Sequence, residues 1–463
     1  MFRVHELINA TCGNLAQGDA FLEVKGVSID TRTIRKNDAF IAIKGDNFDG
    51  HDFIAEAVNK GAGCIILQKG RARVPRRNVA VIEVGDSVQA LGSIAKFHRQ
   101  RFDIPVIAIT GSSGKTTVKE MSAWVLARAH RVLKNQGTQN NHIGVPLTLL
   151  NLTCRHTVAV VELGTNHCGE IEHLAKICCP TIGVVTNIGP AHLEFFGTLA
   201  GVAREKYALI EQLIHPFIAI VNNDDAFLKK KTGAGAYKPF TIGFGIRSPG
   251  DFTASCVTAA KGNVAFEVNK KYGFTLNTAG CHNIYNALAA IAIARVLGLG
   301  YPECARRLRS FDFPKGRGNL VLVGEAQFID DTYNSNPLSL RQALETLASL
   351  TNKGRKICVL GDMLELGSRK ESFHRRAGKL AAKVCDTLIA VGQLSKISAE
   401  EAYSSGLSRR DIFTCNSSCE AADILQQKVA PRKGDLVLVK GSRGMKMEEI
   451  FKKISTRNLK LKT

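Results

Sequence analysis

Residues 110–117 read TGSSGKTT and lie between an apolar run and a helical pattern. In a strand, loop and helix of this kind, backbone N–H groups and the positive end of the helix dipole hold phosphate oxygens. Lys115 is then expected to reach the β- and γ-phosphates, and the Thr116 hydroxyl to bind Mg²⁺. The pattern predicts a nucleoside triphosphate site made by Gly111, Ser112, Ser113, Gly114, Lys115, Thr116 and Thr117.

The alternative for this loop is an ordinary turn rich in glycine and serine. The longer phosphate-loop pattern requires glycine where this chain has Ile109, so the match is to a shorter form, G-x-x-G-K-T-T. An ordinary turn explains the glycines, but it leaves a Lys-Thr-Thr at that offset after a buried strand unexplained. We therefore expect the loop to bind nucleotide.

Two later apolar runs also end in residues with ligand chemistry. Glu162 closes the run at 158–161, where its hard carboxylate oxygen could complete a Mg²⁺ shell begun by Thr116. His192 follows the next run and a turn with proline, and it could be held against a metal or a phosphate. Taken singly, such a glutamate is more often a cap or a surface ion-pair partner, and such a histidine is usually solvated. Their shared position at strand ends is what indicates a site.

The apolar runs also predict the elements that position these residues. Before residue 103, short apolar runs alternate with helical patterns, which predicts a small amino-terminal α/β domain for substrate over residues 1–102. Over residues 103–313, strands separated by crossover-length helical patterns predict a mostly parallel sheet that carries the phosphate loop. Over residues 314–463, buried strands, the first at 320–323, alternate with helices and predict a doubly wound, Rossmann-like domain. The expected fold class is α/β with three domains.

Composition narrows the class of protein. The chain has 463 residues, of which 45% are hydrophobic and 22% charged, and this excludes a disordered or collagen-like protein. Its net charge of +21 favours anionic partners without selecting among nucleic acid, acidic lipid and phosphorylated small molecules. Thirteen cysteines without a C-x-x-C pair indicate a reducing compartment. With no signal-peptide pattern and no apolar run of membrane-spanning length, we expect a cytoplasmic protein that does not insert into membranes.

Several motifs beyond the phosphate loop carry a resemblance to a known family. They are ELGTN at 162–166, TNIGPAHLE at 186–194, GCHNIYN at 280–286, DDTYNSNP at 330–337, GDMLELG at 361–367 and KGSR at 440–443. The set resembles the Mur ligases, ATP-dependent amino-acid ligases of peptidoglycan precursor synthesis, across all three expected domains. It is similar to the branch that joins D-alanyl-D-alanine to UDP-N-acetylmuramoyl-tripeptide, because the sister branches carry a D-Y-A-H type motif at the positions of residues 331–334.

The resemblance implies a role for each matching residue. The catalytic set would be Lys115, Glu162, His192 and Lys206. ATP would also be held by Asn283 and Asn286 at the adenine, by Arg317 at the phosphates and by Asp331 at the ribose. Two Mg²⁺ ions would be bound by Thr116, Glu162, His192 and Lys206. Lys206 stands where the family carries a carbamate formed from CO₂, and the alternative is an exposed lysine on an amphipathic helix.

The amino-terminal segment resembles the part of this branch that binds the uridine diphosphate group. Arg32 and Lys44 suit a diphosphate by their charge, although a capped turn between strands explains any one of these residues almost as well. Asn140 and Asn141 could hold sugar or peptide groups, or only their own loop. The full expected substrate set is Ser28, Asp30, Arg32, Lys44, Asp49, His51, Asn140, Asn141, Asn334 and Asn336.

The implied reaction is ATP-dependent ligation through an acyl phosphate, by a monomer with no nucleic-acid partner. One alternative is another ligase of the same superfamily, either tripeptide-forming or similar to folylpolyglutamate synthase. A second alternative is a basic, nucleotide-regulated protein that binds nucleic acid. It is suggested only by the net charge and by two clusters, and aromatic residues, at 6%, do not interleave with them as a stacking platform requires. The clusters are Arg71, Arg73, Arg76 and Arg77, and Lys229, Lys230 and Lys231.

Overall fold

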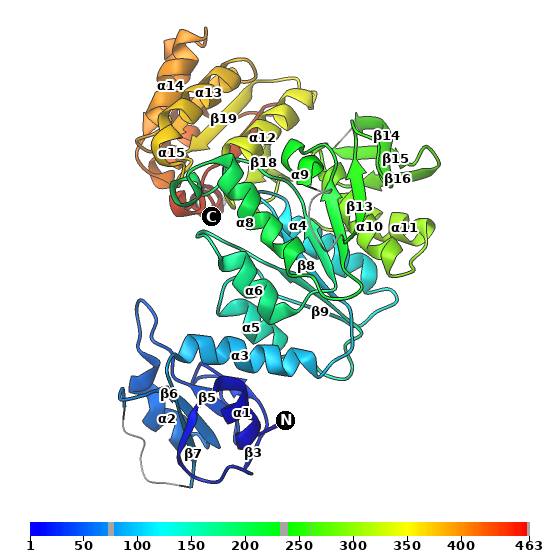
Figure 1. Ribbon diagram of the computed structural model, residues 1–463. Coiled ribbons are helices and arrows are strands. Elements are labelled where there is room, and N and C mark those ends of the chain that lie inside the picture. The colour runs from blue at the N-terminus through cyan, green and yellow to red at the C-terminus, as the bar shows by residue number, and fades with distance from the viewer. Residues whose placement is uncertain (73–77, 232–238, 261, 461–463) are drawn as a thin grey trace.

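The computed structural model describes residues 1–72, 78–231, 239–260 and 262–460, and the predicted α/β class with three domains is confirmed (Figure 1). Each domain is built on one main sheet, whereas the predicted domain borders stay predictions. None of the described helices has the length and apolar character that crossing a membrane requires. Of the basic clusters, Arg73, Arg76 and Arg77 lie outside the described residues, as do the side chains of Lys230 and Lys231.

The amino-terminal domain is a five-stranded sheet, seen in blue in Figure 1. Side chains alternate across its strands, so that Cys64 and Ile66 pack on α1 and α3 while Ile65 and Leu67 pack on α2. The strand order is β2 (Asn14–Gln17), β7 (Ala80–Val84), β6 (Cys64–Gln68), β5 (Ala39–Ile41) and β4 (Val27–Ser28), and all neighbours are parallel except β2 and β7. The helices are α1 (Val4–Thr11), α2 (Ile54–Asn59) and α3 (Ser87–Gln100), and a short ladder joins β1 (Phe2–Arg3) to β3 (Glu23–Val24).

The middle domain carries a nine-stranded sheet among its described residues. From β9 to β14 all neighbouring strands are parallel, as expected for strands joined by crossover helices, and an antiparallel meander of β14 to β16 extends the sheet. The order is β16 (Tyr272–Leu276), β15 (Asn263–Val268), β14 (Phe252–Ala260), β13 (Phe240–Gly245), β12 (Ile218–Asn222), β11 (Ile182–Val185), β8 (Val106–Thr110), β10 (Val158–Glu162) and β9 (Val132–Lys134). Its main helices are α4 (Lys115–Leu126), α5 (Gly144–Leu149), α6 (Glu170–Cys178), α7 (Leu193–Phe196), α8 (Leu199–Glu211), α9 (Ala226–Lys231), α10 (Asn283–Val296) and α11 (Tyr301–Arg309).

One contact on the far end of α4 joins two helices of this domain. Trp124 donates its indole N–H to the Arg307 carbonyl on α11 at 2.8 Å. The Arg307 guanidinium lies 3.8 Å from the centre of the Trp124 ring and donates to the Trp124 carbonyl at 2.7 Å. This reciprocal pair fixes the end of α4 that is opposite the phosphate loop.

The carboxy-terminal domain is a six-stranded sheet, parallel except for its first strand. A buried strand was predicted at 320–323, and the prediction of its burial is wrong. The segment forms β17, an antiparallel edge strand, and Leu322 is 74% exposed. The order is β17 (Asn319–Val323), β18 (Ala326–Asp331), β22 (Leu436–Lys440), β19 (Lys356–Gly361), β20 (Thr387–Val391) and β21 (Ile412–Cys415). The helices are α12 (Pro337–Ser349), α13 (Lys370–Ala382), α14 (Ser395–Ser404), α15 (Ser418–Ile424) and α16 (Glu449–Lys460).

The middle and carboxy-terminal domains share one buried apolar cluster. Leu193 and Phe196 of α7 pack in the same cluster as Met363 and Leu366 from the loop after β19. All four side chains are less than a tenth exposed. Because apolar burial contributes roughly 25 cal/mol per Å², this contact stabilises one arrangement of the two domains.

The junction between the first two domains is fixed by a buried arginine. Arg99, near the end of α3, is only 4% exposed. Its guanidinium donates to the carbonyl oxygens of Cys178 at 3.1 Å, Phe102 at 2.6 Å and Ile104 at 3.2 Å. A charged donor buried among carbonyls is costly to remove, because the oxygens lose their partners.

We predict that Arg99→Met lowers the free energy of unfolding by about 3 kcal/mol, since several buried carbonyls are left unpaired. The measurement is denaturant unfolding followed by circular dichroism. Arg410→Met is the matched control, because the Arg410 side chain is 88% exposed and its loss should change stability by less than about 0.5 kcal/mol. Equal effects of the two substitutions would contradict the structural role of Arg99.

Candidate active site

A cleft of about 1010 Å³ lies where the middle and carboxy-terminal domains meet. The middle domain lines it with the loop after β8, with Glu162 at the end of β10 and with Asn222 at the end of β12. This is the edge at which open parallel sheets bind ligands. The opposite wall includes Arg317 and Lys440 of the carboxy-terminal domain. Within the described residues, the amino-terminal domain contributes nothing to the lining.

The phosphate loop is held by the segment that follows β11. The Ser112 and Ser113 amides donate to the backbone and side-chain oxygens of Asn187, each at 3.0 Å. The Thr186 hydroxyl donates to the Ser113 carbonyl at 2.6 Å. These bonds set the loop's path into α4, which begins at Lys115, so the helix N-terminus faces the cleft.

Two glycines in the loop have no room for a side chain. Gly111 and Gly114 have φ angles of +146° and +81°, which other residues rarely adopt. A Cβ on Gly111 would lie 2.0 Å from the Thr186 hydroxyl, and one on Gly114 would lie 2.3 Å from the Asn286 amide oxygen. The close approach explains why the loop needs glycine at both positions.

Two lysines of the predicted set lie in the same buried region. Lys115 donates to the Gly111 carbonyl at 2.8 Å. Burial lowers the pKa of Lys115, and nearby Arg317 lowers it further, while Glu162 opposes the shift. Lys206 on α8 is 1% exposed, and burial, with Lys115 as the next cause, holds its pKa well below the usual range. In the described part of the chain, no hydrogen bond or ion pair is found at the Lys206 ammonium.

One carboxylate oxygen of Glu162 is held by a hydrogen bond, and the other has no hydrogen-bond partner among the described residues. Its Oε1 accepts from the Asn140 amide at 2.8 Å, and its backbone exchanges hydrogen bonds with the Asn135 side chain. The side chain lines the cleft, the residue is 2% exposed, and Oε2 is buried without a partner. Buried polar atoms are normally paired, so an orphaned carboxylate oxygen indicates a site for a cation.

The residues present fit a Mg²⁺ site that the substrate completes. Among the described residues there is no group of three or more His, Cys, Asp or Glu side chains that could hold a metal ion. Mg²⁺ usually takes only one or two protein carboxylates and fills its shell with phosphate oxygens and water. Glu162, with its unpartnered Oε2, and Thr116, with its hydroxyl, both line the cleft and match that pattern.

His192 lies at the cleft and contacts the other domain. It caps α7 with a left-handed φ of +54°, and its Nδ1 lies 2.5 Å from Oε2 of Glu365. The hydrogen bond from His192 lowers the pKa of the Glu365 carboxyl. The sequence patterns identified the histidine but not its partner.

Arg317 reaches from the carboxy-terminal domain into the nucleotide loop. Its Nη2 donates to the Thr116 hydroxyl at 3.1 Å, and its guanidinium lies 3.7 Å from the centre of the Tyr333 ring. Burial lowers the pKa of Arg317, although an arginine stays charged. Arg317 and Thr116 belong to different domains, and both of them were expected from the sequence to bind the same nucleotide. The structure brings these two residues into contact.

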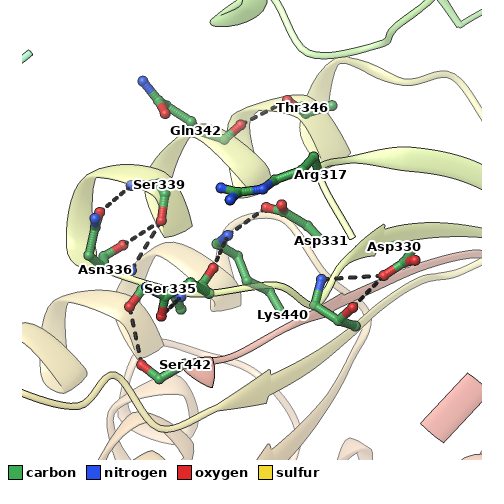
Figure 2. A network of polar contacts seen from close by, with 12 residues as sticks. Arg317, Asp330, Asp331, Ser335, Asn336, Ser339, Gln342, Thr346, Lys440 and Ser442 are labelled. Atoms are coloured by element: carbon green, nitrogen blue, oxygen red, sulfur yellow. Dashed lines mark hydrogen bonds and ion pairs between the residues drawn. The ribbon is translucent and has the colours of Figure 1, made fainter. Parts of the chain in front are cut away.

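Asp331, at the end of β18, is paired with a buried lysine. Figure 2 shows the Lys440 ammonium pointing at Asp331, with Arg317 beside them. Lys440 donates to Asp331 Oδ2 at 2.6 Å and to the Asn334 carbonyl at 2.9 Å, and it is 2% exposed. The pair places a second cation of the carboxy-terminal domain beside the cleft.

The start of α10 supplies the residues expected at the adenine. Asn286 donates to Asn283 at 2.9 Å, and Asn283 donates to the Thr278 hydroxyl at 3.1 Å, with both asparagines buried. His282 precedes them, and burial lowers its pKa to about 4, with its Nδ1 left without a partner. The ring is therefore neutral near pH 7 and faces the same cleft.

The expected uridine diphosphate segment lies outside the cleft. Arg32 is bound through two nitrogens to Asp30, at 2.9 and 2.7 Å, and its side chain is 85% exposed. Asp49 pairs with the buried His51 at 2.6 Å. Ser28 donates to the Asp30 carbonyl at 3.0 Å, and Lys44 bridges to Asp49 through the backbone. The structure thus forms two groups from this half of the predicted substrate set, one of Ser28, Asp30 and Arg32 and one of Lys44, Asp49 and His51.

The other predicted amides divide between the two domains. Asn140 lines the cleft beside Glu162, whereas the Asn141 side chain caps the start of α5 at Gly144 and is exposed. Asn336 caps α12 through Ser339 (Figure 2). It also donates to the Ser112 carbonyl at 3.3 Å. Asn334 lies beside it on the cleft wall.

Sequence patterns missed several residues of the cleft. Lys440 belongs to the quoted KGSR motif but received no role, and neither did Tyr333 or Glu365, although each falls in a quoted motif. Asp224 carried no signal; it accepts from the Tyr285 hydroxyl at 2.8 Å and from three backbone amides, which lower its pKa to about 2. A recognisable sequence motif thus indicates that its residues belong to a functional site, but it does not indicate which residues they contact.

Three protein-family models match the chain. They are the catalytic domain of the Mur ligase family over residues 23–99, the Mur ligase middle domain over 109–294, and the glutamate ligase domain of Mur ligases over 316–443. Among named proteins, the UDP-N-acetylmuramoyl-tripeptide–D-alanyl-D-alanine ligase of Bacillus subtilis is 34% identical, with 97% of this chain and 96% of that protein covered. The ligase of that name from Escherichia coli is also 34% identical, with 96% and 97% covered.

Solved structures give the same result. A crystal structure of MurF from Acinetobacter baumannii has a TM-score of 0.88 at 33% identity, and 98% of each chain is covered. MurF ligase from Thermotoga maritima in complex with ADP has a TM-score of 0.82 at 30% identity, with 94% of this chain and 99% of that chain covered. With relatives above 30% identity over nearly its whole length, and with the phosphate loop, Glu162 and Arg317 gathered at one cleft, the chain belongs to the Mur ligase family.

Proposed function

We propose that this chain joins D-alanyl-D-alanine to UDP-N-acetylmuramoyl-tripeptide, with ATP converted to ADP and phosphate. A carboxylate is a poor electrophile in water, so ATP first phosphorylates it to an acyl phosphate, and the dipeptide amine then displaces phosphate. The names of the relatives support the substrates, and the bound ADP in one neighbour supports the nucleotide.

The observation that carries the proposal is the meeting of cationic groups from two domains at the phosphate loop. Lys115 lies at the start of α4, and Arg317 reaches the adjacent Thr116 hydroxyl from the other domain. Phosphoryl transfer between two anionic reactants is opposed by Coulomb repulsion, which positive groups in a partly dry site offset. The expected adenine contacts, Asn283 and Asn286, line the same cleft, which supports a nucleotide site there.

Mg²⁺ is part of the proposed chemistry. The ion would be held by the Thr116 hydroxyl, by the orphaned Glu162 oxygen and by His192, and a second ion by a carbamate on Lys206. When bound, Mg²⁺ neutralises charge on the phosphate oxygens. Asn140 holds one oxygen of Glu162 in place, and the other oxygen has no hydrogen-bond partner among the described residues and is left for the ion.

The surroundings of Lys206 favour a carbamate. A lysine reacts with CO₂ only as the neutral amine, and burial together with the positive charge of Lys115 lowers the pKa of Lys206. The buried Lys119 differs, since its ammonium donates to the carbonyls of Asn135 and Gly137 and pairs with Glu120. Lys206 has no such partner among the described residues, so carboxylation of its neutral amine would place an anion there that can bind a metal.

In the second step, positioning contributes more than proton transfer. An α-amino group with a pKa of about 7.7 to 8.0 is already partly neutral near pH 7. Orienting the amine against the acyl phosphate can supply several kcal/mol, about 7 to 11 in favourable intramolecular cases. No general base is assigned to this chain.

The amino-terminal domain would hold the uridine diphosphate group through the exposed Arg32 and Lys44. Because these residues lie outside the cleft, the tripeptide must extend from that domain to the phosphate loop, and domain closure would shorten the path. We propose domain borders near 102/103 and 313/314, a monomer, and no nucleic-acid partner. We also propose that the enzyme works in the cytoplasm, where thirteen free cysteines remain reduced.

Substrate-dependent phosphate release tests this function. With ATP, magnesium and the UDP-linked tripeptide, D-alanyl-D-alanine should stimulate phosphate release, while lysine, diaminopimelate and glutamate should not. The product should gain the mass of the dipeptide. Stimulation by a single amino acid in place of the dipeptide would assign the chain to another branch of the family.

Lys115→Met should reduce kcat by about 10²–10³-fold, because the transferred phosphoryl group loses the cation at the phosphate loop. The protein should stay folded, since Lys115 contributes one hydrogen bond to the loop carbonyl of Gly111. Lys176→Met on α6 is the control, because this lysine is 54% exposed and, among the residues that the structure describes, its ammonium pairs only with Glu172. Near-normal turnover of Lys115→Met would contradict the phosphate assignment.

Carbamate formation is predicted to be visible by ¹³C NMR after equilibration with ¹³C-labelled bicarbonate. We expect one carbamate resonance that is absent from Lys206→Arg, whose side chain has no reactive amine. The signal should grow as the pH rises through the lowered pKa of Lys206 and disappear below it, because only the neutral amine reacts. A resonance that persists in Lys206→Arg would place the carbamate elsewhere.

A further inference from the structure

His192 and Glu365 form a contact that crosses the junction of two domains. His192 precedes α7 in the middle domain, and Glu365 lies in the loop after β19 in the carboxy-terminal domain. The distance from Nδ1 to Oε2 is 2.5 Å. Both residues line the cleft that contains the phosphate loop.

Both partners have a backbone conformation that costs free energy. The φ angles are +54° for His192 and +59° for Glu365, in the left-handed region that residues with a side chain avoid. Such strain persists only where the surrounding structure imposes it, and it gathers at functional sites. Two strained residues that contact each other across a domain junction therefore indicate that the contact has a function.

The surrounding contacts fix the pair's geometry. The Glu194 amide donates to the Glu365 carbonyl at 3.1 Å, so the backbones of the two loops are joined as well. Gly367 packs closely against the other loop, because a Cβ there would lie only 3.2 Å from Glu194 Cα. Beneath the pair, Leu193 and Met363 lie in the shared apolar cluster.

The carboxylate decides which ring nitrogen of His192 is free. A carboxylate accepts, so Nδ1 carries a proton in this hydrogen bond, and Nε2 is the ring nitrogen that remains available to a metal ion. Within the described chain, Nε2 has no hydrogen-bond partner. A histidine whose Nδ1–H is held by a carboxylate is the usual arrangement of a metal-binding imidazole.

We propose that Glu365 is a positioning residue: it holds the Nδ1–H tautomer and the orientation of His192, so that Nε2 is presented to the metal. The inference rests on the metal role of His192 in the proposed function and adds the residue that prepares it. Because Glu365 belongs to the carboxy-terminal domain, His192 is oriented only when the two domains are docked. Metal binding and domain docking are therefore coupled through one hydrogen bond.

The test measures Mn²⁺ binding to the full chain with ADP, with free Mn²⁺ counted by electron paramagnetic resonance. Glu365→Ala should weaken Mn²⁺ binding by about 10- to 100-fold, the usual effect of removing a carboxylate behind a metal-binding histidine. Glu365→Gln should restore most of the affinity, because its amide oxygen still accepts from Nδ1. Lys270→Ala is the control for substitution at a left-handed residue, since Lys270 is exposed, has φ of +55° and lies away from the cleft.

A second readout uses ¹⁵N-labelled histidine in the metal-free chain, where the Nδ1–H tautomer of His192 should be lost in Glu365→Ala. A merely structural pair would lower the unfolding midpoint and leave Mn²⁺ affinity and tautomer unchanged, which would overturn the inference. Equal weakening by Glu365→Gln and Glu365→Ala would overturn it too. If His192→Ala binds Mn²⁺ as tightly as the unchanged chain, then His192 is not a metal ligand and that part of the proposed function fails. If His192→Ala weakens Mn²⁺ binding but Glu365→Ala does not, only the role of Glu365 is overturned.

Discussion

Repulsion among cations held close together is the physical constraint on which this site depends. Lys115, Arg317 and Lys440 line one cleft, Lys206 is buried close to Lys115, and burial is the main cause that lowers the pKa of Lys115, Lys206 and Arg317. Like charges about 4 Å apart repel by about 4 kcal/mol at an effective dielectric constant of 20. The fold offsets part of this cost through Asp331 at Lys440 and a carbonyl at Lys115. An anionic nucleotide would remove much of the rest, so ligand binding and a stable cleft support each other.

What the sequence predicted well is local in the chain. The strand before the phosphate loop, the glycines with positive φ and the helix that starts at Lys115 all lie within about twenty residues, where periodicity and small-residue spacing are direct signals. Glu162 could be found because a strand end in a parallel sheet faces the ligand edge. The edge position of β17 could not, because Leu320 and Leu322 are as apolar as the residues of a central strand.

What the sequence could not give is the pairing of residues far apart in the chain. Arg317 and Thr116 are separated by 201 positions, Glu365 and His192 by 173, and Lys440 and Asp331 by 109. Each motif signals a residue of interest, but its partner is decided by how two domains pack. The shared cluster around Leu193 and Met363 brings these motifs together, and its apolar residues carry no functional signal of their own.

The reciprocal contact between Trp124 and Arg307 gives the molecule an intrinsic optical probe. The chain contains a single tryptophan, and it lies on the same helix whose first turn begins at the phosphate loop. Its indole is 38% exposed and stacked under a guanidinium. Any shift or tilt of α4 when the loop is filled changes the environment of this one fluorophore, so its emission reports on the nucleotide site without a label.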